Sequence, residues 1–166
     1  MENMKVKNVI IGKQFEDSEN LQEFLKIVNK KKINVRLVEA GNKINIDKKL
    51  YFEVLWPDSS KSILKNSINN NAMVCKLNYK NFSMLFTGDI EEEAENIITS
   101  QYKETKNLNS IILKVAHHGS KTSSTYKFLE LVKPKLAIIG VGENNKFGHP
   151  NDEVIQKLEE LRSYNI

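Results

Sequence analysis

The chain has 166 residues, 40% of them hydrophobic, which is enough for one domain or a large part of one. Its 25 basic and 21 acidic residues leave a net charge of +4, an excess too small to indicate a nucleic-acid partner by itself. No apolar run approaches the roughly 18 residues needed to cross a bilayer. The single cysteine, Cys75, excludes an internal disulfide, and its alternation with apolar residues predicts a buried strand position.

The first half of the chain is expected to consist mainly of β-strands. Apolar runs at 6–11 and 33–38 predict two strands, separated by a helix that begins at Asp17 or Ser18 and ends at the lysines 30–32. Further strands are predicted at 43–46, 51–55, 72–79 and 82–86, with a polar loop at 59–71.

The second half alternates between helices and strands. The pattern predicts helices at 90–102, from Ser123 or Ser124 to about 132, and at 154–161 after a cap at Asn151 or Asp152, with strands at 111–115 and 136–141. Short apolar strands that alternate with helices indicate an α/β fold in which helices cover a sheet.

Three short polar clusters follow predicted strands. They are Thr-Gly-Asp ending at Asp89, Ala-His-His-Gly-Ser containing His117 and His118, and Gly-His-Pro containing His149, so that all three histidines of the chain are included. The carboxyl ends of strands share one rim in layered α/β folds, and sites form there. A carboxylate with neutral imidazoles is typical of a metal-dependent hydrolytic site. Four residues are, however, too few for a two-metal centre.

Each cluster also has a purely structural explanation. Asp89 could form a turn or cap a helix, the adjacent histidines could lie in a solvent-facing loop, and His149 could be a helix-entry residue beside a proline. The hydroxyls of Ser120, Ser123 and Ser124 could cap a helix or hold a phosphate at its N-terminus.

Taken together, the segments 85–89, 113–120 and 138–150 resemble the metallo-β-lactamase-like domain of the ComEC/Rec2 DNA-internalisation (competence) proteins. The resemblance runs over nearly the whole chain. The segment 69–74 is similar to the Asn-rich strand entry of that family, with Ala72 where serine is usual. The resemblance implies a metallo-β-lactamase-like αβ/βα sandwich.

The resemblance also implies a dinuclear site holding two divalent ions, Zn or Mn. The bridging acid of the family falls on Asp89. The ligand histidine falls on the His117-His118 pair, with His118 preferred and His117 a second ligand or a catalytic neighbour of the metal or substrate. His149 would line the pocket as a catalytic residue that contacts a phosphate or the leaving group, and Ser120 would be a further phosphate contact.

One departure from the family is large: its first signature, a His-x-Asp/His-x-Asp-His stretch, is missing, and no histidine precedes His117. Residues 1–166 are therefore expected to be a single partial domain, the C-terminal portion of the sandwich. By itself this portion is expected to be soluble and inactive, to bind metal weakly or not at all, and to self-associate through the apolar face that the missing N-terminal half would cover. The resemblance leaves two expectations for the parent protein: attachment to a DNA-uptake channel in a bacterial cytoplasmic membrane, or a soluble hydrolase.

The motifs are compatible with three functions. The parent could be a phosphodiesterase or nuclease that acts on single-stranded or duplex DNA during competence. The chain could instead be a non-catalytic module that binds DNA or a protein partner. A small-molecule phosphoesterase, for example of phosphocholine type, would fit the same motifs.

Overall fold

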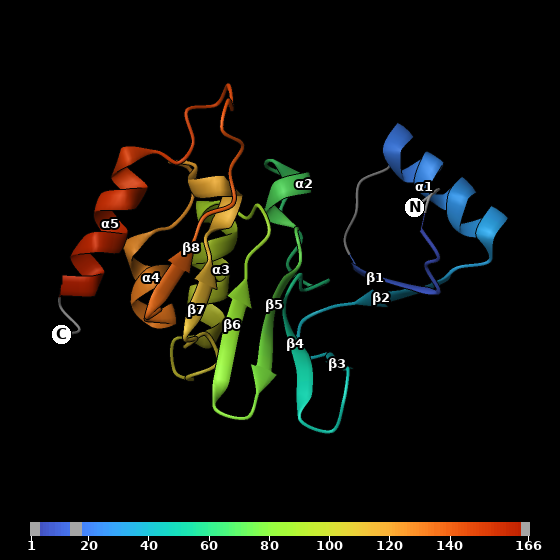
Figure 1. The fold of residues 1–166 in the computed structure, drawn as a ribbon, viewed down its shortest axis with the longest axis horizontal. Coiled ribbons are helices and arrows are strands. Elements are labelled where there is room, and N and C mark those ends of the chain that lie inside the picture. Colours follow the sequence, from blue (N-terminus) through green and yellow to red (C-terminus); the bar gives the residue numbers. More distant parts are fainter. Residues whose placement is uncertain (1–3, 14–17, 164–166) are drawn as a thin grey trace.

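The computed structural model describes residues 4–13 and 18–163 and is a mixed α/β structure with a two-stranded and a six-stranded sheet (Figure 1). Within these residues, none of the helices combines the length and the apolar composition that a membrane span requires.

A small parallel unit opens the described chain. It consists of β1 (Asn8–Gly12), α1 (Glu19–Lys31) and β2 (Asn34–Val38). Ser18 caps α1, since its Oγ accepts a hydrogen bond from the backbone N–H of Leu21 at 3.2 Å. Lys32 ends the helix in a left-handed conformation, with φ of 51°. The alternative cap, Asp17, lies outside the described residues.

The six strands of the larger sheet follow one another in sequence order. They are β3 (Lys43–Asn45), β4 (Leu50–Trp56), β5 (Val74–Tyr79), β6 (Phe82–Phe86), β7 (Ile112–Lys114) and β8 (Leu136–Ile138). The pairs from β3 to β6 are antiparallel, and β6, β7 and β8 are parallel. Parallel neighbours need helical crossovers, and the remaining elements include α2 (Ser67–Asn70), α3 (Glu92–Tyr102), a 3-10 turn (Ala116–Gly119), α4 (Tyr126–Val132) and α5 (Asp152–Ser163).

Helices cover one face of this sheet. Figure 1 shows α3 and α4 behind the strands, with α5 beside them. Leu85 of β6 and Leu113 of β7 are 0% and 1% exposed and pack in one hydrophobic cluster with Ile98 of α3, Phe128 of α4 and Val154 of α5. This cluster is the main core.

The opposite face of the sheet is also apolar. Because side chains alternate along a strand, the strand register places two cross-strand rows on this face, Phe52–Leu77–Met84–Ile112–Leu136 and Val54–Cys75–Phe86–Lys114–Ile138. The parallel unit packs against it near β3 and β4, where Val38, Ile44 and Val54 form one small hydrophobic cluster. From β5 to β8, the described residues place no helix over this face (Figure 1), and Leu136 is 53% exposed.

Several sequence predictions need correction. The expected loop at 59–71 contains the short helix α2. The helix expected from Ser123 or Ser124 begins at Tyr126, because Ser124 has a left-handed backbone with φ of 61°. The backbone N–H groups of Ser124 and Thr125 donate to the carboxylate of Glu95 before the helix begins. The last strand ends at Ile138. Cys75 is buried in β5 as predicted, and burial raises the pKa of its thiol to about 11.

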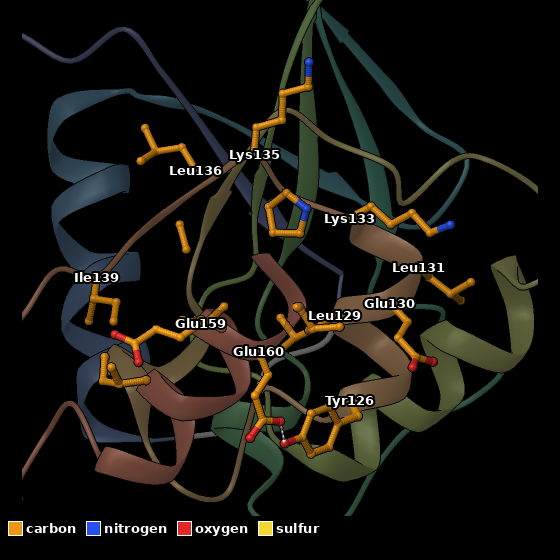
Figure 2. Close-up of a pocket in the computed structure, with 15 residues that line it drawn as sticks. Tyr126, Leu129, Glu130, Leu131, Lys133, Lys135, Leu136, Ile139, Glu159 and Glu160 are labelled. Carbon is orange, nitrogen blue, oxygen red and sulfur yellow. Dashed lines mark hydrogen bonds between the residues drawn. The ribbon is translucent and has the colours of Figure 1, made fainter. Parts of the chain in front are cut away.

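A groove of about 930 Å³ lies between α4, β8 and α5 (Figure 2). Leu129 and Leu136 line it, and the Tyr126 hydroxyl donates a hydrogen bond to Glu160 at 2.5 Å at its edge. None of the predicted site residues lines this groove. It therefore does not mark the candidate site, which lies on the rim of the sheet.

Candidate metal centre

The Thr-Gly-Asp segment after β6 is fastened to the end of β7. The Thr87 hydroxyl donates to the carbonyl of Lys114 at 2.6 Å, and the N–H of His117 donates to the carbonyl of Gly88 at 3.1 Å. Gly88 has φ of 57°, and a Cβ at this position would lie 3.0 Å from the Cβ of Ala72. These contacts place Asp89 beside the histidine pair, although 28 positions separate Asp89 from His117 (117 − 89).

The histidine pair has an uncommon backbone. His117 and His118 have φ of 46° and 55°, a left-handed conformation that costs a non-glycine residue on the order of 1–3 kcal/mol. Gly119 follows with φ of 79°, and a Cβ there would lie 2.8 Å from the Cβ of Pro150. The N–H of Asn151 also donates to the Gly119 carbonyl at 2.9 Å. The Gly-His-Pro segment is thereby held against the histidine pair.

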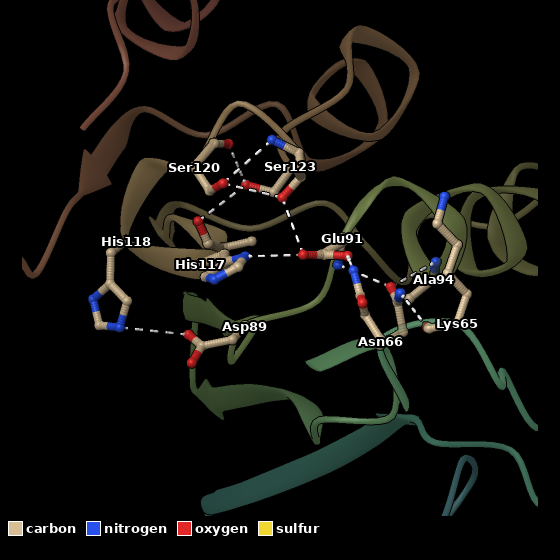
Figure 3. A network of polar contacts seen from close by, with 12 residues as sticks. Lys65, Asn66, Asp89, Glu91, Ala94, His117, His118, Ser120 and Ser123 are labelled. Atoms are coloured by element: carbon tan, nitrogen blue, oxygen red, sulfur yellow. Dashed lines mark hydrogen bonds and ion pairs between the residues drawn. The ribbon is translucent and has the colours of Figure 1, made fainter. Parts of the chain in front are cut away.

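Asp89 and His118 face each other across the rim (Figure 3). Oδ1 of Asp89 lies 3.7 Å from Nε2 of His118, while Nδ1 of His118 lies 2.5 Å from the carbonyl oxygen of Gly140. A carbonyl can only accept, so Nδ1 carries a proton, and in the neutral form of His118 the lone pair of Nε2 points toward the Asp89 carboxylate.

Two acceptors that face each other at this distance fit a shared cation. Zinc lies about 2.0–2.2 Å from nitrogen or carboxylate ligands, and the 3.7 Å separation of Asp89 and His118 is within the sum of two such bonds. The Gly140 carbonyl is the kind of outer partner that orients a ligating histidine. Both side chains are open to solvent, with 43% and 48% exposure.

His117 and His149 form the second part of the site. Their ring centroids are 5.8 Å apart in an edge-on arrangement. Asn145 holds the backbone of His149, because its Oδ1 accepts the His149 N–H at 3.0 Å and its Nδ2 donates to the His149 carbonyl at 2.7 Å. The ring of Phe147 stacks on His149 with centroids 5.9 Å apart. Within the described part of the chain, no group of three or more His, Cys, Asp and Glu side chains converges as a metal site.

Ser120 lies inside the loop. It is 5% exposed, and its Oγ shares a hydrogen bond with the Thr122 hydroxyl at 3.0 Å and accepts the Thr122 N–H at 3.3 Å. Ser123 is 1% exposed and donates to the carbonyls of Ala116 and Ser120. These serine hydroxyls make hydrogen bonds within the loop. The contact of Ser120 with phosphate stays a prediction.

Two acidic residues behind the rim, Glu91 and Glu95, were not among the predicted site residues. Glu91 is 8% exposed and lies beside His117. Glu95 is fully buried and accepts the N–H groups of Ser124 and Thr125 at 2.6 and 2.7 Å. Burial raises the pKa of Glu95, against the opposing effect of these two hydrogen bonds. A signal exists in the sequence, because Glu91, Ala94, Glu95 and Ile98 share one helical face.

The Asn-rich segment before β5 supports the start of α3. Oδ1 of Asn70 accepts the N–H groups of Glu91 and Ala94 at 3.0 and 3.3 Å, which satisfies two donors that the helix end leaves free. The Trp56 indole donates to the Asn70 carbonyl at 2.7 Å. Asn70 therefore acts as a structural cap that positions Glu91 beneath the rim.

The fold and the rim define a mixed α/β protein with an acid–histidine site, and sequence comparisons place it more narrowly. No protein-family model matches the chain. It is 33% identical to ComE operon protein 3 of Bacillus subtilis over 93% of the chain and 19% of that protein. It is 34% identical to competence protein ComA of Neisseria gonorrhoeae over 64% of the chain and 15% of that protein.

A third relative, recombination protein 2 of Haemophilus influenzae, is 32% identical over 69% of the chain and 14% of its own length. These relatives belong to the ComEC/Rec2 family, and the chain is homologous to a segment of them. The chain thus spans less than a fifth of the length of the curated relatives that it matches.

Proposed function

We propose that the chain forms part of a divalent-metal-dependent phosphodiesterase, a nuclease that acts on DNA during competence. The observation that carries this proposal is the 3.7 Å approach of the Asp89 carboxylate to the lone pair of His118 Nε2. The competence names of the relatives supply the context of DNA uptake. The mild positive charge of +4 is compatible with DNA but does not add to the argument.

The finer fold in this proposal is a metallo-β-lactamase-like αβ/βα sandwich, of which residues 1–166 are one portion. A sheet that is apolar on both faces is expected to be covered on both. The two apolar rows from β5 to β8 fit a second layer packed on them, and β1 with β2 would belong to that layer because Val38 already contacts Val54. Other parts of a longer family member would supply the rest of the cover.

Different residues of the rim would bind the metal, transfer protons and contact the phosphate. Asp89 and His118 would hold a cation, and two divalent ions, Zn or Mn, would neutralise the charge that develops on the phosphoryl group. His117 lies behind this pair, where it can exchange a proton with the attacking water or orient the substrate. His149, which Asn145 holds in place, can contact a phosphate oxygen or protonate the leaving group.

The test uses a longer family member that contains this segment together with the additional length of its relatives. We expect metal-dependent cleavage of single-stranded or duplex DNA, a loss of at least about a hundredfold for Asp89→Ala, and a smaller loss for His149→Ala. Changing a residue that only orients a metal ligand already costs about 10–100-fold, so losing a ligand is expected to cost more. Asp47→Ala, at an exposed turn between β3 and β4, is the matched control.

The same assay separates the alternatives. Equal cleavage by wild type and Asp89→Ala would overturn the role of Asp89. Metal-dependent hydrolysis of small phosphodiesters without DNA cleavage would favour a small-molecule phosphoesterase. DNA binding without turnover in the longer chain would favour the non-catalytic module.

A further inference from the structure

The carboxylate of Glu91 is buried directly behind the histidine pair, at the start of α3 (Figure 3). Its Oε1 lies 3.4 Å from Nδ1 of His117 and accepts the Thr122 hydroxyl at 3.2 Å. Its Oε2 accepts the side-chain amide of Asn66 at 2.7 Å. No lysine or arginine among the described residues pairs with Glu91. A buried carboxylate needs donors, and His117 is the ring that can supply one.

The environment of His117 Nδ1 also indicates that this nitrogen carries a proton. This nitrogen is buried and makes no other hydrogen bond within the described structure. The Glu91 carboxylate, at 3.4 Å, lies within ion-pair distance but is not aligned as a hydrogen bond, so a small rotation of the ring would form one. If Nδ1 carried no proton, its lone pair would face a carboxylate in a buried site, which is unfavourable.

We infer that Glu91 is a positioning residue that fixes His117 in the Nδ1–H tautomer, so that the unprotonated Nε2 is presented on the rim. His118 is fixed in the same tautomer by the Gly140 carbonyl. Two adjacent imidazoles, each anchored at Nδ1 by a different partner, then offer two Nε2 lone pairs beside Asp89 and His149. The catalytic value of this arrangement rests on the proposed function, whereas the tautomer does not.

The substitution Glu91→Gln gives a sharp test because the surrounding donors choose the orientation of the new amide. Asn66 donates to the Oε2 position, so the glutamine oxygen is expected there and its NH2 group opposite Nδ1 of His117. Thr122 can accept from that NH2 group, since its hydroxyl can act as donor or acceptor. His117 would then have to accept at Nδ1, and its proton would move to Nε2.

Imidazole ¹⁵N NMR of the 166-residue chain, at a pH where the histidines are neutral, measures both tautomers. We expect His117 to change from Nδ1–H in wild type to Nε2–H in Glu91→Gln, with His118 remaining Nδ1–H in both. Glu92→Gln is the matched control, because Glu92 is exposed on the same helix end and should leave His117 unchanged.

An Nε2–H tautomer of His117 in wild type would overturn the inference, as would an unchanged tautomer in folded Glu91→Gln. If Glu91→Gln does not fold, the wild-type tautomer alone decides between the two outcomes. Failure of the longer chain to cleave DNA would remove the proposed function but leave the tautomer result standing, so the two claims are tested separately.

Discussion

Leu85 and Met84 are neighbours in β6, yet they belong to two very different surfaces. Leu85 is fully buried between the sheet and the helices α3, α4 and α5, while Met84 lies in an apolar row on the opposite face. That row ends at Leu136, which is 53% exposed. The covered face accounts for the stability of the chain and for the placement of the site loops, whereas the open face is apolar without the packing that apolar side chains normally obtain.

A leucine-to-alanine substitution should lower the free energy of unfolding much more on the covered face than on the open face. Leu85→Ala should lower the free energy of unfolding by about 2–5 kcal/mol, since it removes a buried side chain and leaves a cavity. Leu136→Ala should cost about 1 kcal/mol or less, because half of that side chain is already in water. Denaturant unfolding of both variants measures this, and equal losses would show that the open face is as well packed as the covered one.

Glu95 lies on the side of the sheet that the helices cover, and its contribution to stability can be measured. Glu95→Gln should cost about 1–3 kcal/mol at pH 4.5, because the amide leaves the N–H of Ser124 or Thr125 without its acceptor. The pKa of Glu95 is raised above its usual 4.5, so the folded state keeps the proton to a higher pH than the unfolded state. Wild-type stability is therefore lost as the pH rises through the folded pKa.

The advantage of wild type over Glu95→Gln should accordingly shrink from pH 4.5 toward neutral pH. Unfolding of both proteins in a series of buffers isolates this effect, since all other titrating groups are shared. A difference that stays constant or grows with pH would mean that burial does not raise the pKa of Glu95.

The open face should also drive self-association. Ile138→Lys places a second charge beside Lys114 in the second row of this face and should weaken association about tenfold or more, which corresponds to roughly 1.4 kcal/mol. Leu64→Lys is the control, because Leu64 is 89% exposed but lies outside the sheet. Sedimentation measures both, and a wild-type chain that stays monomeric at high concentration would contradict the expectation.

Much of the fold could be predicted from local pattern. The alternating strands, the cap at Ser18 and the hairpin before β6 follow from periodicity and turn chemistry. The start of α4 could not, because it depends on Glu95, which lies 29 positions before Ser124 and is brought there only by packing. The short helix α2 could not be predicted either, because its segment is polar and shows no helical periodicity. Asn70 of this helix caps α3, a contact between segments that are far apart in the sequence.

Part of the candidate site could also be predicted from the sequence, and part could not. The three motifs and their common rim could be inferred from strand ends, and the structure brings Asp89 to His118 and His149 to His117. The partner of each histidine could not be inferred, since Gly140 and Glu91 carry no local mark of that role. The hydrogen bond between the hydroxyls of Ser120 and Thr122 could not be inferred either, and the phosphate contact of Ser120 stays a prediction.

The central claim is that Asp89 and His118 share a cation, and titration of the chain with Mn²⁺ tests it most directly. Paramagnetic broadening of the His118 imidazole signals should appear with weak, millimolar-range affinity, since two ligands leave most of the coordination to water. Asp89→Asn should lose this broadening and Asp47→Asn should keep it. Broadening at His118 that is unchanged in Asp89→Asn would contradict the claim.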